Sequence, residues 1–119
     1  MKKILFVIVI LLTFSCKKDK GELPNPPAED PKYNGLEIHP SFVKSRIKAE
    51  EQYIVDVRRF VLNGTTYYSF DFSTDGSCVL CHVYTSAYVL VTINQTDYNN
   101  NATDHYMIWE NGAVVNQPI

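Results

Sequence analysis

A chain of 119 residues has room for one domain at most. Residues 36–119 carry five Lys or Arg residues against nine Asp or Glu residues, a net charge of −4. No basic stripe is present to neutralise phosphates, so this charge balance argues against nucleic acid as a partner. A domain this small builds only a marginal core, and a covalent link, a cofactor or a partner would add to its stability.

The first fifteen residues are typical of a secretory signal peptide. Lys2 and Lys3 precede a predominantly apolar run, residues 4–14. The run is well short of the roughly 20 residues that a membrane-spanning helix needs, and it matches the apolar core of a signal peptide. We therefore expect export, with residues 1–15 as the signal peptide.

The segment LLTFSC, which ends at Cys16, resembles the lipobox of bacterial lipoproteins. In that family the cysteine is lipidated and becomes the new N-terminus. The resemblance implies a type II signal peptide, lipid (palmitate) on Cys16, and anchoring in the bacterial cell envelope at the outer membrane. An uncleaved anchor, or an ordinary signal peptide with an incidental cysteine, is the alternative. The cysteine count agrees with lipidation, because it leaves Cys78 and Cys81 as a pair.

Residues 16–35 form the predicted tether. The segment is charged at first and then rich in proline, and it has almost nothing to bury. Such a stretch behaves as a semi-extended spacer of about 3 Å per residue. It would hold a single domain, residues 36–119, away from the membrane.

A short helix is predicted near the start of this domain. Pro40 and Ser41 mark its beginning. Its apolar stripe recurs at a spacing of three to four residues and consists of Phe42, Val43 and Ile47.

Antiparallel strands are predicted from Tyr53 onward, where the apolar period changes to two and Val, Ile, Tyr, Phe and Thr dominate. Three pairs of turn residues, each typical of a two-residue hairpin, separate the strands: Asn63-Gly64, Asp75-Gly76 and Asn111-Gly112. The predicted fold class is therefore α+β, with a short N-terminal helix packed on an antiparallel β-meander of about five or six strands.

The first two turns predict a register. The expected pairs are Leu62 with Thr65, Phe60 with Tyr67, Val57 with Phe70 and Val55 with Phe72, then Thr74 with Ser77, Phe72 with Val79, Phe70 with Cys81 and Tyr68 with Val83. On this register one face, covered by the helix, collects Val55, Val57, Val61, Phe70, Phe72, Val79, Cys81 and Val83.

The opposite face is predicted to be polar and aromatic. An aromatic row of Phe60, Tyr67 and Tyr84 crosses three strands there, with Arg58 beside it. Rigid aromatic rings next to hydrogen-bonding groups suit recognition, so these four residues are the candidate binding face for an unknown envelope protein or a small ligand. The alternative is a second buried face covered by the C-terminal hairpin around Trp109.

The motif Cys-Val-Leu-Cys-His, residues 78–82, resembles the attachment site of c-type haem. The resemblance implies covalent haem c on Cys78 and Cys81, with His82 as an iron ligand and electron transfer as the function. Attachment needs a helical or tightly turned backbone, so that both sulfurs point the same way. The surrounding β-branched and aromatic residues instead predict a strand, on which the two cysteines face opposite sides.

Other states of these cysteines remain open. They include free thiols, a disulfide across a bulge or local turn, and a zinc site completed by His82 and His105. A redox pair like that of thioredoxin-like proteins is disfavoured by the absence of alternating βα units.

No catalytic motif is present in the sequence: there is no Gly-x-Ser-x-Gly elbow, no Gly-rich phosphate loop and no His-Glu-x-x-His. Asp56 and Asp71 are predicted opposite each other, and we expect them to form a solvated surface cluster with Arg58. We therefore expect a membrane-anchored, non-catalytic binding or interaction module of the bacterial envelope. The alternative is a small c-type haem electron-transfer protein.

Overall fold

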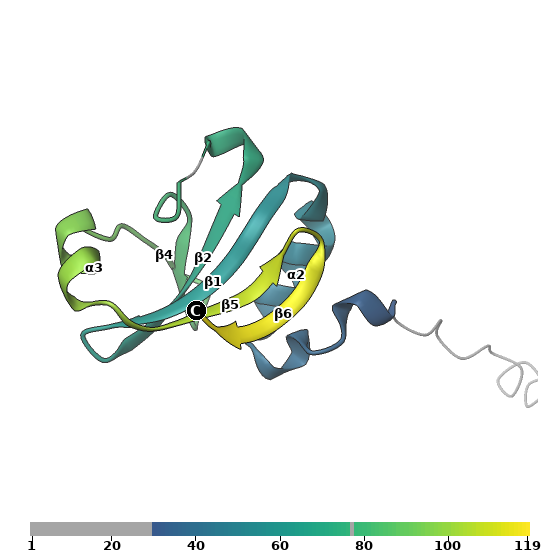
Figure 1. Ribbon diagram of the computed structural model, residues 1–119, viewed down its shortest axis with the longest axis horizontal. Coiled ribbons are helices and arrows are strands. Elements are labelled where there is room, and N and C mark those ends of the chain that lie inside the picture. The colour runs from purple at the N-terminus through teal and green to yellow at the C-terminus, as the bar shows by residue number, and fades with distance from the viewer. Residues whose placement is uncertain (1–29, 77) are drawn as a thin grey trace, which may run out of the picture.

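The computed structural model describes residues 30–76 and 78–119 (Figure 1). Its centre is one antiparallel sheet of six strands in the order β4-β3-β2-β1-β5-β6. The strands are β1 (Ile54–Leu62), β2 (Thr65–Phe72), β3 (Val83–Thr85), β4 (Leu90–Val91), β5 (Thr103–Glu110) and β6 (Ala113–Pro118). After β4 the chain returns across the sheet, so that β5 pairs with β1. The strand order therefore differs from that of the predicted meander.

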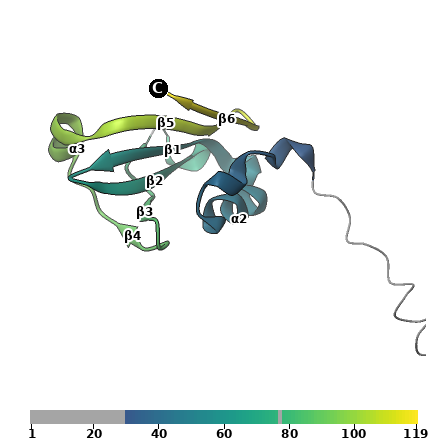
Figure 2. The same cartoon turned by 90° about the horizontal axis from the view of Figure 1, so that it is seen from below.

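Helix α2 (Ser41–Glu50) packs on one face of the sheet, which we call the helix face (Figure 2). It confirms the predicted helix. It is not the first element, because the 3₁₀ turns η1 (Pro31–Tyr33) and η2 (Leu36–Ile38) precede it. A third turn, η3 (Glu51–Tyr53), leads into β1, a fourth, η4 (Ser73–Asp75), follows β2, and a short helix, α3 (Gln95–Asn101), precedes β5. No helix in residues 30–76 and 78–119 is long and apolar enough to cross a membrane.

The main core lies between α2 and the helix face. Its fully buried members are Leu36, Val43, Ile47, Val57, Phe70, Ile108 and Trp109. Tyr33 stacks on Trp109 with ring centroids 6.0 Å apart and is itself buried. Residues 31–35, which we expected in the tether, therefore belong to the folded unit.

A second core lies on the opposite face of the sheet, which we call the far face. Phe60, Leu62 and Val83 are buried there. The side chains that cover them come from β2, the loop before β3, β4 and the α3 segment, and are Tyr67, Leu80, Val91, Ile93, Tyr98 and Ala102. Around Phe60 the far face is thus apolar and covered. Its cover comes from these side chains and not from the hairpin around Trp109.

The hairpin at Asn63-Gly64 forms as predicted, with both residues at positive φ. The pairs Leu62–Thr65, Phe60–Tyr67 and Val57–Phe70 are confirmed. A bulge at Val55 then shifts the register, so that Ile54 and not Val55 lies opposite Phe72. Val55 is left 40% exposed. The hairpin at Asn111-Gly112 also forms, and it joins β5 to β6.

The hairpin predicted at Asp75-Gly76 does not form. The 3₁₀ turn η4 and an irregular loop follow β2, and the chain rejoins the sheet only at Val83. Val83 lies opposite Ser69 and Tyr84 opposite Tyr68, one residue away from the predicted register. A shift of one residue turns every side chain to the other face of a strand. Val83 therefore belongs to the second core and Tyr84 packs against the main core.

Candidate functional site

The predicted signal peptide, Cys16 and most of the tether lie outside the described residues. Export and lipidation therefore stay predictions.

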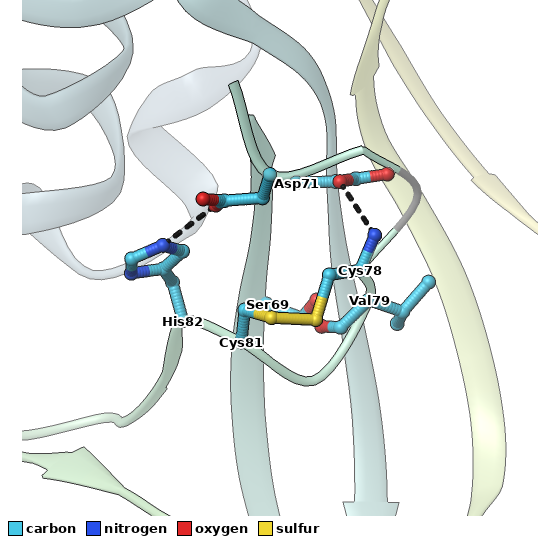
Figure 3. The surroundings of a disulfide bond; sticks show 7 residues. Ser69, Asp71, Cys78, Val79, Cys81 and His82 are labelled. Atoms are coloured by element: carbon cyan, nitrogen blue, oxygen red, sulfur yellow. Dashed lines mark hydrogen bonds and ion pairs between the residues drawn. A yellow bond between two sulfur atoms is a disulfide. The ribbon is translucent and has the colours of Figure 1, made fainter. Parts of the chain in front are cut away.

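The cysteine motif lies in a turn and not in a strand. Cys78 and Cys81 form a disulfide, with their Cα atoms 5.5 Å apart (Figure 3). The expectation that the two sulfurs diverge on opposite faces of a strand is wrong. The β propensity of these residues predicted a strand, but they lie in the connection between β2 and β3, which is longer than the predicted two-residue turn. The backbone turns there between the two cysteines.

Two buried side chains of β2 hold this loop. The Ser69 hydroxyl donates to the backbone carbonyl of Val79, and Asp71 Oδ1 accepts from the backbone N–H of Cys78 at 3.3 Å (Figure 3). Ser69 is fully buried and Asp71 is 6% exposed. Buried polar groups need hydrogen-bond partners, and the backbone of the loop supplies them.

The described arrangement does not fit haem attachment. The sulfurs of Cys78 and Cys81 are bonded to each other. Nε2 of His82, a nitrogen that could ligate iron, lies 2.7 Å from Asp75 Oδ2, and its ring packs edge-on against Phe72. Covalent haem would require a different state of all three residues, and it stays an untested alternative.

No group of three or more His, Cys, Asp or Glu side chains in the described part of the chain is placed to hold a metal ion. His105, the fourth ligand of the zinc alternative, packs against the rings of Phe60 and Tyr98.

The predicted binding face is divided between two layers. Phe60 is only 1% exposed and belongs to the second core, with Tyr67 packed against it. Tyr84 lies on the helix face, where its hydroxyl accepts from Arg46 Nη1 at 2.8 Å. The predicted aromatic row across three strands is therefore not formed. The one-residue register shift at β3 is the cause.

Asp56 and Asp71 do lie opposite each other, but both are buried, at 4% and 6% exposed. The expected solvated cluster is therefore wrong. Arg58 forms a bidentate pair with Asp56, through Nε at 3.2 Å and Nη2 at 3.1 Å. The hydrogen bond to Asp56, opposed by partial burial, raises the pKa of Arg58 above its ordinary value. Arg58 is thus committed to a structural ion pair.

An open hollow of about 540 Å³ lies on the helix face, between β1, β2, β5 and β6. The residues that line it are Arg59, Val61, Thr66, Tyr68, Asp104, His105, Tyr106 and Pro118. The volume falls within the range of about 300–1,000 Å³ that is typical of small-molecule sites.

Arg59 is the cationic group of this hollow, and Asp104 is an anionic group that also lines it. Its guanidinium lies 4.2 Å from the centroid of the Tyr106 ring. It forms no ion pair with any described residue, whereas Arg46 is paired with Glu50 and Arg58 with Asp56. The guanidinium of Arg59 is therefore stacked on an aromatic ring, and no carboxylate of residues 30–76 and 78–119 is its ion-pair partner.

His39 packs edge-on against the rings of Tyr68 and Tyr106, two walls of the hollow. Its Nε2 lies 2.8 Å from Asn116 Oδ1, while Asn116 Nδ2 donates to the carbonyl of Gly35. An amide oxygen only accepts, so Nε2 carries the proton. Nδ1 is left as a buried acceptor without a partner. Burial lowers the pKa of His39, and the charge of Arg59 lowers it further, against the opposing hydrogen bond of Asn116.

A shallower groove of about 390 Å³ lies between α2 and the disulfide loop, lined in part by Arg46, Glu50, Phe72, Asp75 and His82. Its charged groups are paired with one another. Arg46 bonds to Glu50 at 2.8 Å and His82 to Asp75 at 2.7 Å. We therefore take the hollow at Arg59 as the candidate ligand site.

Sequence reasoning did not identify Arg59, His39 or Tyr106 as site residues. One signal was present: Arg59 interrupts the apolar positions Val57 and Val61 on the side of β1 that faces the helix. A cation at such a position needs an aromatic or anionic neighbour. The neighbour itself comes from β5, which pairs with β1 only through the long return from β4.

Searches with the chain find no matching family model, no matching curated protein and no matching solved structure.

Proposed function

We propose that this protein is a lipid-anchored, non-catalytic binding module of the bacterial envelope, and that its ligand is a small organic anion held in the hollow at Arg59. The proposal has two parts. The resemblance of the N-terminal segment to lipoprotein signals supports the anchor at Cys16. The hollow on the helix face supports the binding site.

Arg59 is the observation that carries the binding proposal. A guanidinium presents a planar fork that matches a carboxylate in a bidentate way, and this group has no carboxylate partner among the described residues. The stacked ring of Tyr106 holds the fork in place, so little conformational freedom is lost when an anion binds.

The polar groups around Arg59 indicate what else the ligand carries. Thr66 and the exposed Asp104 line the same hollow and can bond to hydroxyl groups, while the rings of Tyr68 and Tyr106 offer apolar faces. A hydroxylated carboxylate, such as a sugar acid, satisfies both requirements. The sequence carries no catalytic motif, which supports binding without turnover.

The test compares glucuronate with glucose. The two sugars differ at one carbon, which is a carboxylate in glucuronate and a hydroxymethyl group in glucose. Affinities are measured by calorimetry or NMR titration on the full chain and on Arg59→Gln. We expect glucuronate to bind the parent more tightly than glucose. Arg59→Gln should weaken glucuronate binding by roughly tenfold to a hundredfold, the equivalent of losing a hydrogen bond to a charged group, with glucose unaffected.

Lys32→Gln is the matched control. It removes the same charge from an exposed ion pair with Glu51, away from the hollow. Its affinity for glucuronate should equal that of the parent. Equal losses of glucuronate affinity in the two variants would mean that the effect comes from net charge alone. Unchanged glucuronate binding by Arg59→Gln would contradict the hollow as the binding site. Circular dichroism checks that each variant is folded.

A further inference from the structure

We propose that Cys78 and Cys81 form a thiol–disulfide exchange site that cycles between disulfide and dithiol in the folded protein, with Cys81 as the sulfur that reacts with an external dithiol. This activity is separate from ligand binding at Arg59 and does not depend on it.

The two cysteines differ in access. Cys81 is exposed, whereas Cys78 is half-buried and its backbone N–H is bonded to the buried Asp71. In Figure 3, Cys78 lies beside Val79 and Asp71, and Cys81 lies on the other side of the turn, next to His82. Thiol–disulfide exchange depends on access to the sulfur that is attacked. An incoming thiolate therefore reaches Cys81 first.

The loop keeps its anchors when the bond between the sulfurs breaks. Ser69 holds the carbonyl of Val79, Asp71 holds the amide of Cys78, and the amide of Phe70 donates to the carbonyl of His82 at 2.9 Å. None of these hydrogen bonds involves a sulfur. Reduction should therefore leave both thiols close together and ready to reoxidise.

The disulfide is poorly suited to a purely structural role. It joins residues only three apart in sequence, and the chain-entropy gain from a cross-link grows with the length of the loop that it closes. A link this short restrains a turn that β2 already holds. A disulfide that adds little to the stability of the fold, and in which one cysteine is exposed, can be reduced and re-formed without loss of the fold.

The reaction balances with a dithiol as reductant. A thiolate of the dithiol attacks Sγ of Cys81, the bond to Cys78 breaks, and Sγ of Cys78 leaves as a thiolate that takes up a proton. The second thiol of the dithiol then attacks the mixed disulfide and releases Cys81. Two electrons and two protons pass to the protein, and the dithiol leaves as its own disulfide. The return step uses an external disulfide as the oxidant: it takes the two electrons and two protons back by the reverse exchange and leaves as two thiols.

The first measurement uses the full chain with Cys16→Ser, so that Cys78 and Cys81 are its cysteines. The protein is incubated with dithiothreitol without denaturant, alkylated and weighed. We expect both cysteines to be alkylated while the circular dichroism spectrum stays that of the oxidised protein. Reduction that occurs only in denaturant, or only with loss of the folded spectrum, would mean that the disulfide is a structural link.

The second measurement identifies the reactive sulfur. Cys78→Ser and Cys81→Ser, each in the Cys16→Ser chain, are treated with oxidised glutathione, and the mixed disulfide is followed by mass. Cys78→Ser, which retains the exposed Cys81, should react at least about tenfold faster than Cys81→Ser. Equal rates, or a faster reaction at Cys78, would overturn the assignment. As a control, the same reaction is run with both variants unfolded in urea. If the mixed disulfide then forms at equal rates, a difference between the folded variants comes from the fold.

Discussion

Three arginines show how partners decide what a charged residue does. Arg46 is bonded to Glu50 and to the hydroxyl of Tyr84, and Arg58 is bonded to the buried Asp56. Arg59 has the ring of Tyr106 under its guanidinium, and no carboxylate in the described part of the chain forms an ion pair with it. Two of these charges therefore stabilise the fold, and the third is available to a ligand.

The Arg58–Asp56 pair should be costly to break. Arg58→Met leaves the Asp56 carboxylate, 4% exposed, without its cation. Loss of one partner of a buried pair costs about 3–5 kcal/mol, and because Arg58 is partly exposed we expect about 2–3 kcal/mol here. Urea unfolding measures the change. Lys32→Met, which breaks the exposed pair with Glu51, should cost clearly less than Arg58→Met, because an exposed ion pair adds little to stability. Similar costs for the two variants would contradict the structural role of Arg58.

His39 should make stability depend on pH. In the unfolded chain it takes up a proton near pH 6.5, whereas burial lowers its pKa in the folded protein. The contribution of neutral His39 to the free energy of unfolding is therefore fully present above about pH 6.5. It falls, by at most about 1.4 kcal/mol per pH unit, as the pH drops from there toward the pKa of His39 in the folded protein. Urea unfolding at pH 7.5, 6.5 and 5.5 measures this slope. His39→Gln keeps a donor for Asn116 and should flatten the profile relative to the parent. His82 and His105 are present in both proteins, so identical profiles would exclude His39 as the cause.

At the scale of elements, a hairpin was predicted correctly from the sequence where the turn residues themselves determine the turn. Asn63-Gly64 and Asn111-Gly112 set hairpins because both residues adopt positive φ, a local property. Asp75-Gly76 does not, because the buried Ser69 and Asp71 draw the loop backbone toward β2. The requirement is tertiary, so the dipeptide alone does not reveal it. This single difference moved Tyr84 to the helix face and separated the predicted aromatic row.

Helix α3 supplies part of the cover of the second core, through Tyr98. Its first turn is capped by Asn94, whose side-chain oxygen accepts from the backbone N–H of Asp97 at 2.9 Å. Asn94→Ala should lower the free energy of unfolding by about 1 kcal/mol. Gln95→Ala, one residue further along the same exposed turn, makes no cap and should change it by less than about 0.5 kcal/mol. Thermal unfolding of the two variants compares them. A larger loss for Gln95→Ala would show that α3 is held in another way.

At the scale of the whole molecule, residue patterns predicted the helix, the antiparallel sheet and its first hairpin. They did not predict the return of β5 to β1, because that pairing depends on contacts between residues about 50 positions apart in sequence. The hollow depends on the same pairing, since Arg59 comes from β1 and Tyr106 from β5. Its position therefore could not be predicted before the strand order was known.

The proposed anchor is tested by intact mass of the full chain, produced in a bacterium and recovered from the membranes of that host. We expect a chain that begins at Cys16 and carries covalent lipid, and Cys16→Ser should appear in the soluble fraction without it. The same spectrum examines the haem alternative, because covalent haem on Cys78 and Cys81 adds its own mass. A chain that retains residues 1–15, or lacks lipid, would contradict the anchor.

The most direct test of the binding account is a map of amide shifts in the ¹⁵N-labelled full chain during titration with glucuronate. We predict that the shifts concentrate at Arg59, Tyr68 and Tyr106, around the hollow on the helix face. Shifts confined to the groove at Arg46 or to the disulfide loop, or no shift at millimolar glucuronate, would contradict the account.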